Sequence, residues 1–298
     1  MGFKYKAQVL RVMKWLFVGW LLLVLWGFTF AWRKVPEYNV VSPIALSVPV
    51  MSNAEYGELI DSHARPYIVD IDTPAGGRVV IYGAEHTKDP GNMQIGEINT
   101  IWGEMQPTVA LVESWLGILF PGLMDPVETF GEPGAVHALA RQSNIPTYTW
   151  EPSLEQSISS LLEQGFSKEQ VAMRTFLNPA FSSRRFGNAQ QSEMLVEEAL
   201  RKRQDWPHIG GIYESVQDLD AGWQALFPEG PDWRDVSDEY SLPGFLKEMD
   251  GNLVRDNHLV QVIVDLVERN ERVFAVAGVS HAVKVEAALV AMLSADEP

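Results

Sequence analysis

Short apolar runs alternate with longer stretches of helical periodicity along most of the chain. Runs rich in β-branched and aromatic residues predict strands at 67–72, 78–82, 108–112, 146–150 and 272–277. The first two flank a Thr-Pro-Ala-Gly-Gly cluster, which favours a hairpin. Helices are predicted at 95–105, 134–142, 245–270 and 282–293. This alternation predicts an α/β fold with a mostly parallel central sheet flanked by helices and preceded by one N-terminal transmembrane helix.

The predicted transmembrane helix rests on one apolar segment near the amino terminus. Residues 15–32 (WLFVGWLLLVLWGFTFAW) contain no charged residue and approach the roughly 20 residues that cross a bilayer. Trp15 and Trp32 stand at the two ends, where indole rings sit well at the headgroup level. We therefore expect a single-pass anchor within residues 1–34, since no later stretch of comparable length lacks charge.

Cations on either side of this segment predict its orientation. Four precede it and two, Arg33 and Lys34, follow it, which favours a cytoplasmic amino terminus and an extracytoplasmic body. The alternative is a cleaved signal peptide, because Thr29-Phe30-Ala31 resembles a small-x-small cleavage site. The length of the apolar run and the bulky cleavage context favour the retained anchor.

The remaining chain is predicted to contain a linker and one large domain. Three prolines interrupt residues 35–54, and proline removes a backbone donor and fixes extended geometry, so this stretch is predicted to be a linker. Residues 55–298 are predicted to form the α/β domain. A helical or lid-like insertion is expected in it at about 153–243, with a helix break near Asn178-Pro179.

The amino-acid composition and the charge exclude several classes of protein and one class of partner. Of 298 residues, 46% are hydrophobic, which excludes a disordered or collagen-like chain. The sequence has no cysteine, which excludes a disulfide scaffold and a thiolate metal site. Residues 1–34 carry a charge of +6, so the formal net charge of −16 leaves −22 on residues 35–298. An acidic body repels phosphate backbones, and we expect no nucleic-acid partner.

Two predicted strands lead into the same motif, a glycine followed three residues later by a histidine. The motifs are Gly83-Ala84-Glu85-His86 and Gly278-Val279-Ser280-His281. Glycine is expected here to let the chain leave the sheet at dihedrals closed to other residues. On neighbouring parallel strands, His86 and His281 would face one crevice at the carboxyl edge, where open α/β sheets bind ligands. The alternative is a pair of histidines that only cap helices. His258 could share the crevice, although a core or surface position is favoured for it, and the remaining histidines have no comparable context.

Carboxylates follow two further predicted strands. Glu113 comes directly after the third strand and Glu151 after the fourth. An ionised carboxylate beside an apolar strand is costly unless a metal or a cation pairs with it. Arg255 is a candidate partner, because it lies one turn before an apolar stripe on the last long helix. The alternative role for Arg255 is a structural ion pair.

Two histidines and a glutamate without thiols are the ligand set of an open catalytic metal site. Imidazole nitrogens and one hard oxygen suit zinc, manganese or cobalt, with His86, His281 and Glu113 as the predicted ligands. Such a metal activates water for amide or ester hydrolysis. Glu85 or Glu151 is then a candidate general base, and Glu113 is the alternative base if it is not the third ligand.

A metal-free site is the alternative that the same residues allow. In it, His86 activates water, and Arg255 or His281 stabilises the oxyanion. A serine nucleophile is not favoured, although Gly278–Ala282 nearly matches the nucleophile elbow of α/β-hydrolases. That fold requires an acid and then a histidine after the serine, and no histidine follows His281.

Taken together, these motifs resemble the TraB/PrgY and TIKI group of proteins and, more distantly, the erythromycin-esterase and ChaN-like proteins. The resemblance covers about 80–115 and 250–293. It is carried by Gly83–His86, Pro107–Glu113, Arg255-Asp256 and Val276–His281.

The resemblance implies an α/β domain with the paired Gly-x-x-His turns in its active site. By analogy with TIKI, it implies a membrane-tethered, metal-dependent peptidase with His86, Glu113, Arg255 and His281 in the site. Glu85 departs from the family pattern, in which this position is often small or apolar. It is either a further ligand or base, or a solvent-facing acid at a helix start.

The sequence therefore predicts a single-pass, membrane-anchored hydrolase, most simply a metal-dependent peptidase acting on a peptide or ester. A second hypothesis is a non-catalytic binder of a signalling peptide or haem, as other members of the wider group suggest. A third is a folded scaffold in which the strand-end groups form only a buried polar network.

Overall fold

The structure is a computed structural model, and it divides into two compact units. It describes residues 13–25, 27, 31–40, 43–74, 76–185, 192–236, 243–249 and 251–294. Unit 1 comprises residues 1–48, 62–151 and 261–298, and unit 2 comprises residues 49–61 and 152–260. The insertion predicted at about 153–243 thus falls within unit 2.

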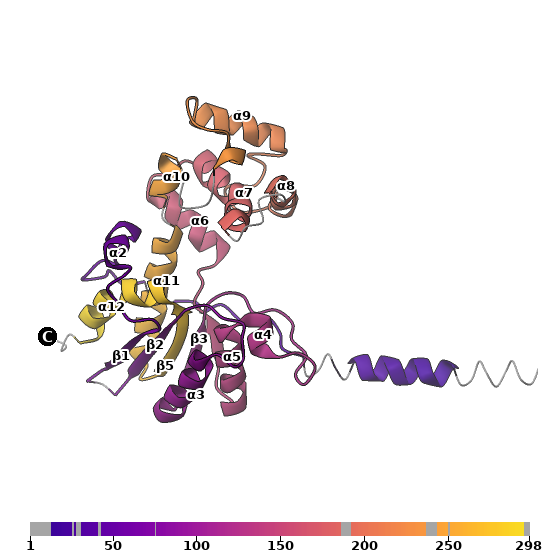
Figure 1. Ribbon diagram of the computed structural model, residues 1–298, viewed down its shortest axis with the longest axis vertical. Helices are drawn as coiled ribbons and strands as arrows, with labels where there is room; N and C mark the ends of the chain where they lie inside the picture. The colour runs from indigo at the N-terminus through magenta and orange to yellow at the C-terminus, as the bar shows by residue number, and fades with distance from the viewer. Residues whose placement is uncertain are drawn as a thin grey trace, which may run out of the picture. The chain divides into compact units, whose positions relative to one another are not determined.

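Unit 1 is built on a five-stranded, mostly parallel sheet (Figure 1). The strands are β1 (Tyr67–Asp72), β2 (Arg78–Ala84), β3 (Val109–Val112), β4 (Thr147–Thr149) and β5 (Arg272–Gly278). They lie in the order β1-β2-β5-β3-β4. Only β1 is antiparallel, and its pairing of Asp72 with Arg78 closes the predicted hairpin. The predicted α/β class and the parallel character of the sheet are confirmed.

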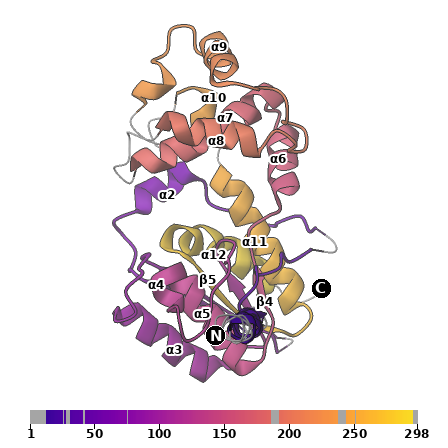
Figure 2. The same ribbon diagram turned by 90° about the vertical axis from the view of Figure 1, so that its right-hand side faces the viewer.

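Helices cover both faces of this sheet, as expected for parallel strands, which are stable when buried on both sides. On one face, α3 (Met93–Met105) and α5 (Glu132–Ser143) lie side by side (Figure 2). Their apolar side chains form a core with alternate strand residues, including Val80, Tyr82, Val112, Phe274 and Val276. On the other face, α12 (Val279–Leu293) packs against β1 and β2. A short helix, α4 (Pro126–Phe130), precedes α5.

The first part of the predicted linker belongs to unit 1. Val35 is buried in the core, and the backbone N–H of Thr149 donates to the carbonyl oxygen of Pro36 at 2.9 Å. The side-chain amide of Gln261 accepts from and donates to the backbone of Ile44, at 2.8 and 2.6 Å. The chain therefore runs beside the β4 edge, where proline is tolerated because no ladder donor is required there. Within the predicted linker, Val35, Pro36 and Ile44 are thus in contact with unit 1.

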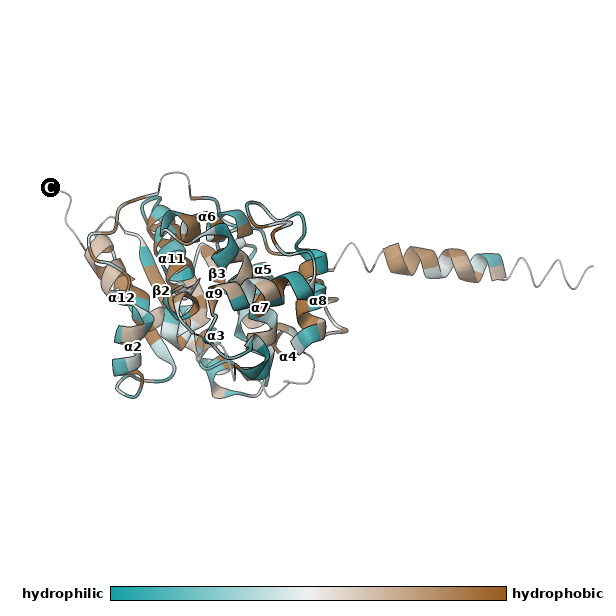
Figure 3. Ribbon diagram, turned by 90° about the horizontal axis from the view of Figure 1, so that it is seen from above, coloured by the Kyte–Doolittle hydropathy of each residue, from teal (hydrophilic) through white to brown (hydrophobic). Residues whose placement is uncertain are grey.

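The apolar amino-terminal segment is only partly described. Residues 13–25 are helical, and most of this helix has the colour of hydrophobic residues in Figure 3. Most of its apolar side chains are exposed. Trp26 and residues 28–30 of the predicted anchor lie outside the described residues. Among the helices of the described residues, none is both long and apolar enough to cross a membrane.

Trp32, predicted at the headgroup level, lies instead inside unit 1. Its backbone N–H donates to the carbonyl oxygen of Leu119 at 2.8 Å. Its ring meets the imidazole of His137 edge-on, with 4.6 Å between the ring centroids. Ala31 is also buried. Burial of this indole against the folded domain is the physical reason that the predicted segment must end before residue 31.

Unit 2 is helical in its described residues and has its own core. Its helices are α2 (Asn53–Leu59), α6 (Leu154–Glu163), α7 (Lys168–Arg185), α8 (Ser192–Lys202), α9 (Val216–Leu226), α10 (Phe245–Glu248) and the first part of α11 (Gly251–Val267). A 3-10 turn, η2 (Trp233–Asp235), follows α9. The core gathers Phe176, Phe181, Trp223, Trp233 and Leu246.

Three sequence-based expectations for this unit differ from the structure. The break predicted near Pro179 is absent from the described helix α7, which runs through this residue with fully buried neighbours that hold the helix together. The single helix predicted at 245–270 is two helices, α10 and α11. Helix α9 was not predicted; a capping box of Ser215 and Asp218 begins it within a proline-interrupted stretch.

The buried His137 of α5 gives unit 1 a pH-sensitive position. Its Nδ1 lies 3.0 Å from Oγ1 of Thr147, at a distance suited to a hydrogen bond. Burial, together with the nearby Arg141 guanidinium, lowers the pKa of His137 from 6.5 to about 4. The folded state therefore favours the neutral ring, while the unfolded chain is protonated below about pH 6.5.

We expect His137→Gln to remove part of the acid sensitivity of the fold. Between pH 6.5 and 4 the unfolded wild type gains a proton that the folded state lacks, so its free energy of unfolding falls as pH falls. Between pH 7 and 4.5 this loss should exceed that of H137Q by roughly 1–2 kcal/mol. Urea unfolding at both pH values measures the difference, and an equal loss in the two proteins would contradict the assignment.

Candidate functional site

The predicted site residues of unit 1 follow strands that end at one edge of the sheet. In the parallel register, Ala84 of β2 is opposite Gly278 of β5, and Val112 of β3 is opposite Val276. His86 comes two residues after β2, Glu113 directly after β3, and His281 in the first turn of α12 after β5. The neighbouring placement of the two Gly-x-x-His strands agrees with the prediction.

The two motif glycines allow close approach between elements, and neither has the positive φ that was expected. A Cβ on Gly83 would lie 2.7 Å from both Cβ of Ala282 and the carbonyl oxygen of Tyr67. A Cβ on Gly278 would lie 3.0 Å from Nε2 of His86 and 3.7 Å from Cδ2 of His281. Both imidazoles therefore come within 4 Å of one point above Gly278.

The first of two carboxylate–histidine pairs near Gly278 is the one with little exposure, Glu113 and His281. Oε2 of Glu113 accepts a hydrogen bond from the backbone N–H of Gly278 at 2.7 Å, and Oε1 lies 3.7 Å from Nε2 of His281. The His281 side chain is only 7% exposed, and the indole of Trp150 meets it edge-on. Trp150 is held in turn by its Nε1–H, which donates to the carbonyl oxygen of Val276 at 3.0 Å. This pair is rigidly positioned by β3, β5 and the residue after β4.

The second pair consists of the exposed His86 and another glutamate, Glu132. Nδ1 of His86 lies 3.6 Å from Oε2 of Glu132. The imidazole is 65% exposed, whereas the Glu132 side chain is 2% exposed. The other oxygen of Glu132 accepts a hydrogen bond from the backbone N–H of Thr87, which fixes the carboxylate behind the ring.

Glu132 is a site residue that the sequence reasoning missed. It begins α5, and an acid in the first turn of a helix is ordinarily explained by the helix dipole alone. The preceding Gly131 has φ +67, and a Cβ there would lie 2.8 Å from the carbonyl oxygen of Thr87. In the sequence, the only indication of the contact between Glu132 and His86 is a Gly-Glu pair at a helix start. That pair does not identify His86 as the partner of Glu132.

Three other predicted site residues have contacts of their own. Glu85 is about half exposed, 3.9 Å from Nη1 of Arg65, and precedes no helix directly. Glu151 follows β4 and accepts a hydrogen bond from the backbone N–H of Ser114 at 3.3 Å. Arg255 belongs to α11 within unit 2, where it is half-buried.

The residues at Gly278 have the donor atoms of a divalent metal site without its geometry. Across the part of the chain that the structure describes, no three His, Asp or Glu side chains are grouped so that they could hold one metal ion. Glu113 instead uses one oxygen for the Gly278 N–H and turns the other toward His281. In this arrangement the side chains of His86, Glu113 and His281 are not grouped around one metal position.

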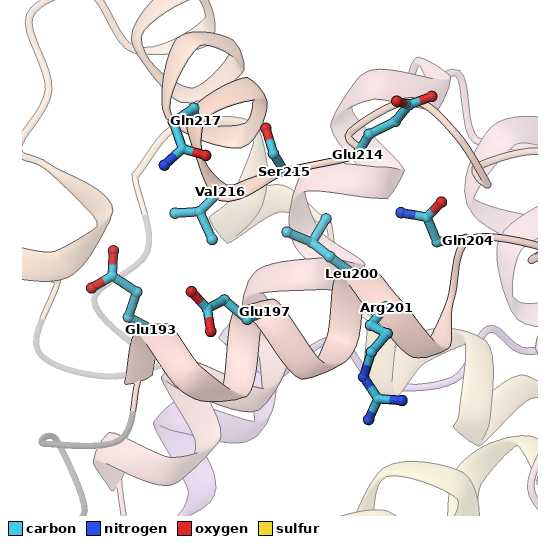
Figure 4. Close-up of a pocket in the computed structure, with 9 residues that line it drawn as sticks. All are labelled: Glu193, Glu197, Leu200, Arg201, Gln204, Glu214, Ser215, Val216 and Gln217. Carbon is cyan, nitrogen blue, oxygen red and sulfur yellow. The ribbon is translucent and has the colours of Figure 1, made fainter.

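Unit 2 contains a separate open cleft of about 570 Å³ between α8 and the start of α9 (Figure 4). Its lining includes Glu193, Glu197, Arg201 and Glu214. None of the predicted site residues lies in this lining. The cleft is acidic and gives no arrangement of a base with a nucleophile.

Comparisons with protein-family models, with curated proteins and with solved structures give no match to this chain. The resemblance to the TraB/PrgY and TIKI group stays a prediction. The arrangement at Gly278 must therefore be interpreted from its own chemistry.

We expect Gly83→Ala to destabilise unit 1, because the added methyl group meets a backbone oxygen and a helix methyl at 2.7 Å. The free energy of unfolding should fall by about 1–3 kcal/mol. Gly96→Ala is the control: its Cβ meets nothing within 4 Å on the exposed side of α3, and alanine favours the helix by up to about 1 kcal/mol. Chemical denaturation of both variants makes the comparison, and equal stabilities would contradict the close packing.

Proposed function

We propose that this chain is a hydrolase of amide or ester bonds, with His86 as its general base. The observation that carries the proposal is the exposed imidazole of His86, which lies beside the buried Glu132 and shares the space above Gly278 with the ring of His281. An exposed base in front of a fixed carboxylate is the arrangement that activates water or a hydroxyl in many hydrolases.

Glu132 would select the reactive form of the base. A carboxylate beside Nδ1 favours the tautomer with its proton on that nitrogen and leaves the lone pair on Nε2. The separation of 3.6 Å is longer than a hydrogen bond, and such contacts often tighten only when substrate binds. Glu132 is thus a positioning residue, and His86 is the catalytic residue.

The reaction consumes one water. Nε2 of His86 accepts a proton as the water oxygen bonds to the carbonyl carbon of the substrate. The same proton then passes to the leaving nitrogen or oxygen as the carbon–nitrogen or carbon–oxygen bond breaks. The His281 ring approaches the same point above Gly278 as the His86 ring and is proposed to donate to the developing oxyanion.

The substrate class follows from the predicted family resemblance and the membrane segment. A peptide is favoured over a simple ester, because the resemblance to TIKI implies a peptidase. Arg255 is proposed to bind a substrate carboxylate, the role that its guanidinium suits best. Residues 15–32 are proposed to attach the body to the extracytoplasmic face of a membrane, with Trp32 withdrawn into unit 1.

We expect His86→Ala to abolish hydrolysis of an internally quenched peptide library or of p-nitrophenyl butyrate. Removing a general base typically lowers kcat by 10²–10⁴-fold. Glu132→Gln should lower kcat by about tenfold or more with little change in KM, because it loosens the orientation of the ring. The measurement is the initial rate of the full chain in detergent or nanodiscs.

The control for these variants is His208→Asn, which removes an exposed imidazole in unit 2 and suits its left-handed backbone at φ 65. Its rate should equal that of the wild type. Full activity of H86A would exclude the proposed base. Loss of wild-type activity with chelator, restored by manganese, cobalt or zinc, would instead favour the metal-dependent peptidase.

We expect the full chain to resist extraction from membranes by alkaline carbonate and to dissolve only in detergent. The variant L22R/L23R places two cations in the apolar segment, and each costs roughly 2.5–3.5 kcal/mol at the centre of a membrane helix. It should move largely to the soluble fraction. Intact mass of the wild type distinguishes the retained anchor from a cleaved signal peptide, and a carbonate-soluble wild type of full length would contradict anchoring.

A further inference from the structure

One loop of unit 1 exposes apolar side chains beside the point where the predicted anchor enters the fold. Residues 114–124 (SWLGILFPGLM) join β3 to α4 and contain no charged residue, although the body as a whole is strongly acidic. Leu123 is 86% exposed and Ile118 is 58% exposed, while Leu116 and Leu119 are buried and hold the loop to the core. Exposed apolar groups gathered in one segment indicate a binding surface.

The loop is joined directly to the end of the apolar segment. Trp32 and Leu119 form an antiparallel bridge, with the Trp32 N–H donating to the Leu119 carbonyl. Two residues later, Nζ of Lys34 lies 3.8 Å above the ring of Trp115. Arg33 and Lys34 are both exposed. Aromatic and cationic side chains together are typical of protein surfaces at the level of lipid headgroups.

The position of Trp32 also limits the distance between unit 1 and a membrane. Because Ala31 and Trp32 are buried, a spanning helix that began at Trp15 would have to end at residue 30. Such a helix would be about 24 Å long, shorter than the roughly 30 Å of hydrocarbon in a typical bilayer. A short span draws the attached residues toward the lipid.

From these three observations we propose that residues 114–124 insert into the lipid interface beside the anchor. The partner is the bilayer itself, and the exposed apolar residues Ile118 and Leu123 are the groups that enter it. The inference rests on the proposed membrane attachment and goes beyond it, because attachment alone places no residue of unit 1 in the lipid.

The test places a single fluorescent probe on the loop of the full chain. The natural sequence lacks cysteine, so Leu123→Cys and Ile118→Cys each give one site for an NBD label. The labelled chains are reconstituted into phosphatidylcholine vesicles with and without lipid that carries a doxyl group near the headgroup. Doxyl lipid should quench both probes at least about twofold, because interfacial groups lie within the outer 5–10 Å of the bilayer.

The matched control is Asp72→Cys, an 80%-exposed position on β1 that pairs with Arg78 at the opposite edge of the sheet. Its probe should be quenched by aqueous iodide and unaffected by doxyl lipid. The same behaviour at positions 118 and 123 would overturn the inference while leaving anchoring intact. So would a blue-shifted probe without doxyl quenching, which indicates contact with a second copy. Failure of the chain to float with the vesicles would overturn anchoring and the inference together.

Discussion

The close approach of β2, β5 and the first turn of α12 is the constraint on which the candidate site depends. It exists because Gly83 and Gly278 have no side chain at the points of contact. At Gly83 the space is filled by Ala282 and a backbone oxygen, and at Gly278 the two imidazoles fill it. The parallel pairing alone would bring the carboxyl ends of β2 and β5 to one edge of the sheet. Only the missing side chains allow the rings to converge there.

Convergence gives the two histidines different environments. His281 is enclosed by Trp150 and faces a carboxylate that a backbone N–H already holds. His86 stands in solvent, and its carboxylate is the buried partner of the pair. A buried charge is stabilised by such pairing, and an exposed ring keeps access to substrate and water. The arrangement therefore combines a rigid polar support with an exposed imidazole, and for this reason we propose His86 as the base.

Local patterns predicted the elements well and the long-range polar contacts poorly. The hairpin, the parallel strands and the adjacency of the two Gly-x-x-His turns follow from apolar runs and turn residues. Glu132 could not be assigned, because its contact with His86 joins a loop after β2 to a helix start 46 positions later, and no periodicity encodes that pairing. Likewise Pro179 is a helix breaker in isolation, and burial of its neighbours in α7 overrides that preference.

The apolar amino-terminal segment shows that a hydrophobic residue predicted to lie in lipid can instead be buried in the folded protein. Hydropathy treats residues 15–32 as one uniform stretch, yet Trp32 finds its apolar environment against His137 and Leu119 within unit 1. A residue that is buried in protein cannot also serve as the end of a span in lipid. The boundary of the proposed anchor is thus set by tertiary packing. The same packing brings the uncharged loop at 114–124 to that boundary, so the proposed attachment and the proposed interfacial contact would have one structural origin.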